Sequence, residues 1–185
     1  MLEFPNKFFD LVNHRLATSW LRTWDWPKLL QEYQRVCRPK GVVRITEGDW
    51  TAARNSVALS RLFDLSVKAL SQAGHLFTPT GSGVTGQLVR LLKQHGLQQV
   101  QTRAFTLEYR AGTPAGQHYF EDNRLAFRTM LPFLRKWTHV PAEYESIYQQ
   151  ALVEMQQPDF VATWNMLTAW GVVPPRRQER ADAPS

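Results

Sequence analysis

The sequence predicts an α/β fold in which helices pack on a partly parallel sheet. An apolar run at 8–12 is followed by a segment of helical periodicity at 26–37 and by a second apolar run at 42–46. A strand, a helix of about a dozen residues and another strand form the crossover that joins parallel strands. Further strand-like runs at 100–109 and 160–170 bring the expected sheet to about four strands.

The first crossover has clear local signals. In the segment 26–37 apolar residues recur every three or four positions, which is typical of an amphipathic helix. Asp25 stands where a cap is expected, and Pro27 is tolerated in the first turn. Pro39 and Gly41 then interrupt the helix before the second strand begins.

The remaining elements follow from periodicity and from glycine and proline positions. The strand at 100–109 alternates, with Phe105, Leu107 and Tyr109 on its apolar face. The other predicted elements are helices at 56–73, 85–95, 119–137 and 141–156 and a final strand at 160–170.

Composition indicates one globular domain. The chain has 185 residues, of which 43% are hydrophobic, and this is enough to bury a core. We expect a domain over 1–174 and a disordered tail at 175–185. No apolar run approaches the roughly 20 residues that cross a bilayer, and the amino terminus has no signal peptide pattern, so we expect a cytoplasmic protein. The single cysteine, Cys37, excludes an internal disulfide.

The charge is positive but dispersed. Lys and Arg number 22 against 16 Asp and Glu, which gives a net charge of +6. The one local basic cluster, at Arg176, Arg177 and Arg180, lies in the polar tail. Nucleic acid is therefore an unlikely partner, and an RNA-directed function would rest on the charge alone.

Two consecutive segments resemble a known family. The run LEFPNKFFDLV at 2–12 is similar to the approach to the fourth strand of class I S-adenosylmethionine-dependent methyltransferases, in particular the UbiE-like (type 11) members. The run WPKLLQEYQRVCRPKGVVRITEGDW at 26–50 resembles the helix and turn that precede their fifth strand. The later order of elements also fits, so the resemblance covers nearly the whole chain.

The resemblance implies a partial Rossmann-like sheet whose last strand is antiparallel, with helices on its faces and a helical insertion at about 113–158. It implies S-adenosylmethionine as cofactor and methyl transfer to a small-molecule acceptor. The family's glycine-rich cofactor loop has no counterpart here, so the chain corresponds to the carboxyl-terminal portion. The alternative is a non-catalytic fragment or pairing subunit, in which the strand at 8–12 is an exposed edge that self-associates.

The resemblance also places candidate site residues at the carboxyl ends of the two parallel strands, where ligands of such sheets bind. Asn13, His14 and Arg15 match residues near the cofactor's methionine group. Glu47, Asp49 and Trp50 match the rim of the acceptor pocket. Glu47 or His14 would be the base if the acceptor must lose a proton. A loop histidine with a surface hydrogen bond is an equally good interpretation of His14.

Residues 81–86 spell GxGxxG and open a predicted helix, with Glu108 about twenty residues beyond. This spacing imitates a dinucleotide-binding fingerprint. The fingerprint requires a buried strand that leads directly into the first glycine, and the preceding residues contain Pro79 and no strand formers. We therefore favour a flexible loop on the substrate side.

The remaining candidates are less specific. The five histidines, His14, His75, His95, His118 and His139, show no metal-ligand spacing, so no metal is expected. An aromatic series is most simply explained by packing between two helices, and its alternative is a lid over an apolar acceptor. The series consists of Tyr119, Phe120, Phe127, Phe133, Trp137, Tyr144 and Tyr148.

Overall fold

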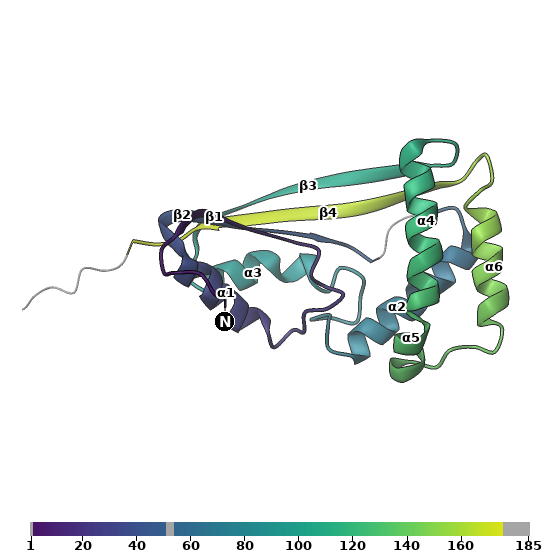
Figure 1. Ribbon diagram of the computed structural model, residues 1–185, viewed down its shortest axis with the longest axis horizontal. Coiled ribbons are helices and arrows are strands. Elements are labelled where there is room, and N and C mark those ends of the chain that lie inside the picture. Colours follow the sequence, from purple (N-terminus) through teal and green to yellow (C-terminus); the bar gives the residue numbers. More distant parts are fainter. Residues whose placement is uncertain (1, 51–53, 176–185) are drawn as a thin grey trace, which may run out of the picture.

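The computed structural model describes residues 2–50 and 54–175 (Figure 1). The elements are β1 (Phe9–Arg15), α1 (Trp26–Val36), β2 (Cys37–Gly48), α2 (Val57–Gln72), the 3-10 turn η1 (Thr85–Gln87), α3 (Leu88–Gln94), β3 (Gln98–Arg110), α4 (Pro114–Thr129), α5 (Leu131–Trp137), α6 (Tyr144–Glu154) and β4 (Val161–Val172). Nearly all of the predicted tail at 175–185 lies outside the described residues.

The sheet has four strands in the order β1-β2-β4-β3. β1 and β2 are parallel, and β4 runs antiparallel to both β2 and β3. The helix α1 joins the two parallel strands, as the spacing of the apolar runs predicts. The predictions of an α/β fold, of about four strands and of an antiparallel last strand are therefore confirmed.

The parallel pair is longer than the apolar runs alone suggest. β1 continues to Arg15, which pairs with Thr46, and β2 starts directly after α1 and continues to Gly48. Asn13 and His14 consequently belong to the strand, although the sequence suggests that they follow it. The reason is that hydrogen bonding to a neighbouring strand extends a strand through polar residues.

The stretch predicted as one helix at 119–137 is divided. α4 begins earlier, at Pro114, because the Thr113 hydroxyl accepts a hydrogen bond from the amide of Gly116 and caps the first turn. α5 begins separately, with Pro132 in its first turn. A proline cannot donate the backbone hydrogen bond that a continuous helix would need there.

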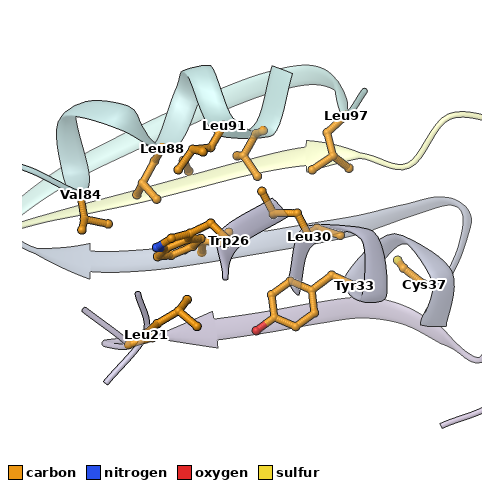
Figure 2. Close-up of a cluster of buried hydrophobic side chains, with 14 of the residues drawn as sticks. Leu21, Trp26, Leu30, Tyr33, Cys37, Val84, Leu88, Leu91 and Leu97 are labelled. Atoms are coloured by element: carbon orange, nitrogen blue, oxygen red, sulfur yellow. The ribbon is translucent and has the colours of Figure 1, made fainter. Parts of the chain in front are cut away.

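The first hydrophobic core lies between the sheet and the helices α1 and α3 (Figure 2). Trp26 and Leu30 of α1 and Leu88 of α3 are fully buried. Both helices lie on the same side of the sheet in Figure 1, although the resemblance implies helices on its faces. On the opposite face, within the described ranges, Leu11 is 48% exposed and Arg44 is exposed.

The second core joins α2 to α4, α5 and α6 at one end of the molecule (Figure 1). The Tyr144 hydroxyl donates to the carbonyl of Phe127 at 2.6 Å, and the Tyr148 hydroxyl donates to that of Arg124 at 2.8 Å. These two bonds tie α6 to α4. Tyr144 and Tyr148 thus pack between helices, whereas Phe127 of the same aromatic series also lines a cavity, so the alternative of a lid stays a prediction.

Truncation of the first core tests this packing. Leu92 of α3 is fully buried, so Leu92→Ala should lower the free energy of unfolding by about 2–5 kcal/mol through lost burial and a residual cavity. Leu125 of α4 is 52% exposed, and Leu125→Ala should change it by no more than about 0.5 kcal/mol. Urea denaturation measures both values, and equal values would contradict the packing described.

Candidate functional site

A cavity of about 470 Å³ lies beside the carboxyl end of β2. Asp49 and Trp50, which directly follow β2, form part of its lining, and Trp164 of β4 forms another part. α2 contributes Phe63, and α4 contributes the largest share. The cavity therefore lies where the sheet and the helical end of the molecule meet.

Backbone and side-chain bonds fix the segment after β2. The Asp49 amide donates to the carbonyl of Asn165 at 2.9 Å, and the Trp50 amide donates to that of Gly81 at 3.0 Å. The Thr85 hydroxyl donates to the Asp49 carboxylate. Gly48 leaves room for Trp164, because a Cβ on Gly48 would lie 2.5 Å from the indole. These contacts hold Asp49 at the rim.

α4 forms one wall of the cavity with residues spaced three or four apart. Ala115, Tyr119, Asp122 and Ala126 share this face, and His118 lies beside them. Tyr119 is buried, whereas His118 and Asp122 are exposed. The periodicity of α4 is visible in the sequence, but only its packing shows that this face meets Asp49.

An arginine lies behind the aromatic lining. The Arg54 guanidinium is 3.8 Å from the ring centroid of Phe63, and the rings of Tyr119 and Tyr109 stack at 4.5 Å. Burial lowers the pKa of Arg54. Burial raises the pKa of the Tyr119 hydroxyl, an effect that the positive charge of Arg54 opposes. Sequence analysis missed Arg54, because no local pattern marks it.

Glu47 lies on the other face of β2, away from the cavity lining, and is 1% exposed. One carboxylate oxygen accepts a hydrogen bond from the Ala17 amide at 2.8 Å. The other accepts bonds from the Thr18 hydroxyl at 2.7 Å and the Thr18 amide at 3.3 Å. The carboxylate therefore holds the turn after β1, and its role as a base stays a prediction.

His14 belongs to the same buried cluster and is 7% exposed. Its Nδ1 atom is hydrogen-bonded to the Tyr33 hydroxyl, and its Nε2 atom lies 3.6 Å from Glu47. Its ring stacks with that of Trp20 at 6.0 Å. Burial, with a smaller contribution from the charge of Glu47, raises the pKa of Tyr33 to about 12. The interpretation of His14 as a surface loop histidine does not fit this burial.

The residues expected near the cofactor are largely engaged within the chain. The Asn13 amide oxygen accepts a hydrogen bond from Arg44 Nε at 2.8 Å, and His14 lies between Tyr33 and Glu47. Arg15 is exposed. This arrangement offers S-adenosylmethionine few free polar groups, so these residues alone do not fit it, and no reaction step is assigned to them.

The GxGxxG segment is a loop packed against the cavity rim. In the structure no strand leads into it, since residues 75–84 form turns and bends. The carbonyl of Gly81 binds the Trp50 amide, and Thr85 binds Asp49. A dinucleotide fingerprint would require a buried strand here. The loop instead positions the segment after β2.

No group of three or more His, Cys, Asp or Glu side chains that could hold a metal ion occurs in the described ranges. His75, for example, is engaged within the chain: its Nδ1 atom lies 3.0 Å from the carbonyl oxygen of Leu21, and its ring contacts Phe133. Likewise, none of the described helices is long and apolar enough to span a membrane.

The comparison with protein-family models gives no match, and the comparison with curated proteins gives none. Among solved structures, a Bacillus halodurans protein assigned to the methyltransferases is similar, with a TM-score of 0.48 and 15% identity, over 95% of this chain and 74% of that one. Haemonchus contortus phosphoethanolamine N-methyltransferase 2, solved with S-adenosyl-L-methionine, has a TM-score of 0.41 and 18% identity over 94% and 35%.

Geranyl diphosphate methyltransferase, solved with GPP and sinefungin, has a TM-score of 0.43 and 11% identity over 94% of this chain and 50% of that one. Each of these three similarities covers 94% or 95% of this chain. This chain spans only 35% of the Haemonchus contortus enzyme and 50% of geranyl diphosphate methyltransferase. At these identities and TM-scores the similarities assign no role to any residue, and the site is described from its own geometry.

The Glu47 cluster yields a stability prediction. In Glu47→Gln an NH2 group would face the donors of either Ala17 or Thr18, so the free energy of unfolding should fall by about 1–3 kcal/mol. Glu108 forms an exposed ion pair with Arg110, and Glu108→Gln should cost at most about 1 kcal/mol. Chemical denaturation compares the two variants. Unchanged stability of Glu47→Gln would remove the anchoring role and favour a catalytic one.

Proposed function

We propose that this chain provides the acceptor-binding part of an S-adenosylmethionine-dependent methyltransferase that acts on a small molecule. The observation that carries the proposal is the apolar cavity beside the carboxyl end of β2. Ligands of α/β sheets bind at this edge, and about 470 Å³ is within the range of small-molecule sites. The sequence motifs at 2–12 and 26–50 supply the reaction class by resemblance.

The cavity offers two contributions to such a reaction. Its apolar walls, which include Trp50, Phe63 and Ala126, would exclude water and orient the acceptor. Asp49, His118 and Asp122 lie in the lining and are groups that can accept a proton from an acceptor O–H or N–H. Orientation is the larger contribution when the acceptor atom carries no proton.

Filling the cavity tests the proposal. Ala126→Trp places an indole into the acceptor space, so kcat/KM for methylation of a small-molecule acceptor should fall by ~10-fold or more. Leu125→Trp adds the same group at the neighbouring exposed position and should leave kcat/KM unchanged. The assay follows transfer of a radioactive methyl group to a broad acceptor panel by the full chain, purified with any partners that accompany it.

Two results would contradict the proposal. One is the absence of methyl transfer to every acceptor in the panel by folded protein. The other is an equal effect of Ala126→Trp and Leu125→Trp on the transfer that is observed.

A second candidate function, a pairing subunit, rests on a separate observation. β1 is the outermost strand of the sheet, and its outer edge has no partner strand within the described ranges. Phe8 and Leu11 at this edge are 53% and 48% exposed. An unpaired apolar edge of this kind is a template for pairing with another strand.

A charge at the edge should prevent this pairing. In sedimentation experiments the unmodified chain should associate as its concentration rises, whereas Leu11→Lys should remain monomeric, because pairing would bury the ammonium group. Leu107→Lys changes an exposed leucine of β3, the opposite edge strand, and should associate like the unmodified chain. An unmodified chain that is monomeric at every concentration would contradict self-pairing.

A further inference from the structure

Directly behind the cavity wall lies a cation, Arg54, of which two nitrogens lack a hydrogen-bond acceptor. Arg54 Nε and Nη2 are inaccessible to solvent and have no hydrogen-bond partner in the described part of the chain. An isolated β-bridge to Ala162 fixes the backbone of Arg54, and the guanidinium lies over the ring of Phe63. The ring face attracts the positive charge but accepts no hydrogen bond in the guanidinium plane.

A second group with an unpaired proton lies in the wall itself. The Tyr119 hydroxyl is buried and belongs to a side chain that lines the cavity, and the side chains that act on it, Arg54 and Asn123, do so as donors, so its own proton has no acceptor among the described residues. Tyr119 is 9% exposed, and stacking with Tyr109 holds its ring in place. The charge of Arg54 acts on this hydroxyl, so the two groups are neighbours.

Two unpaired donors, Tyr119 in the apolar wall and Arg54 behind it, call for an acceptor from outside the chain. Buried polar groups are normally paired, and an unpaired buried charge is costlier than an unpaired neutral group. The charge of Asp64 acts on Arg54, but Asp64 is exposed, so solvent screens it. An anionic oxygen group would satisfy both donors, since a guanidinium binds carboxylate and phosphate through paired hydrogen bonds.

We propose that the cavity binds acceptors that carry an anionic oxygen group, a carboxylate or a phosphate, which accepts a hydrogen bond from the Tyr119 hydroxyl and is attracted by the Arg54 guanidinium behind it. The apolar body of the acceptor then packs against Phe63, Trp50 and Ala126. This inference rests on the proposed acceptor role of the cavity and specifies its substrate class. A neutral acceptor of the same shape would leave Arg54 unpaired and would bind more weakly.

The experiment compares three probes of similar shape on the full chain by calorimetry: 3-phenylpropionate, 2-phenylethyl phosphate and 3-phenylpropan-1-ol. At least one anion should bind about 10-fold or more tightly than the alcohol, as expected for hydrogen bonds to charged groups. The ratio between the two anions distinguishes a carboxylate site from a phosphate site.

Substitutions of Arg54 test whether this residue causes the preference for anions. Arg54→Met should reduce anion affinity to the level of the alcohol, whereas Arg54→Lys should retain part of the preference because it keeps the charge. Arg61→Met, an exposed arginine of α2, is the matched control and should bind like the unmodified chain. Arg54→Met should melt no lower than the unmodified chain, because it removes an unpaired buried charge.

Three results would overturn the inference: equal affinities of the anions and the alcohol, an anion preference that survives in Arg54→Met, or no binding of any probe to folded protein. Methyl transfer to neutral acceptors without an anion preference would overturn this subsite and leave the proposed function intact. An anion preference without methyl transfer to any acceptor would support this subsite and contradict the proposed function.

Discussion

The pairing of β2 on both of its sides is the constraint on which the rest of the structure depends. β2 hydrogen-bonds to β1 in parallel and to β4 in antiparallel register, so it lies between the first strand and the last strand of the chain and joins them into one sheet. Val43 and Ile45 of β2 are fully buried against α1 and α3. The same strand ends at the cavity. Sheet, first core and site are therefore built around one element.

The end of β2 at Gly48 separates two polar residues with different roles, Glu47 and Asp49. Glu47 points to the face that α1 covers, where its carboxylate binds the turn after β1. A side chain at position 48 would point to the opposite face, and the glycine there leaves room for Trp164. Asp49 follows at the cavity rim. Side chains at i and i+2 share one face of a strand, but β2 ends at Gly48, so Asp49 leaves this alternation and lies at the cavity rim. The resemblance places Glu47 with Asp49 and Trp50 at the acceptor rim, but Glu47 is not part of the cavity lining.

Local patterns predicted the architecture better than the site. The apolar runs and the helical period at 26–37 are local signals of strand, helix and strand, and the observed order follows them. The start of α4 was missed, because the cap formed by Thr113 precedes the predicted start at 119. No local sequence pattern predicts the cavity. It brings together Asp49 after β2, Phe63 of α2 and Tyr119 of α4, with Arg54 behind them, and only packing of distant segments determines that meeting.

The position of Arg54 links stability to ligand binding. Without an acceptor the buried guanidinium opposes folding, because charge is less well solvated in the protein than in water. The same weak solvation strengthens its interaction with an anion that enters the cavity. A ligand whose anion interacts with Arg54 therefore offsets the unfavourable free energy of burying an unpaired charge. Because the cavity exists only in the folded chain, binding of this ligand also raises the free energy of unfolding. A residue that served the fold alone would show no such coupling, since its contacts would be complete within the chain.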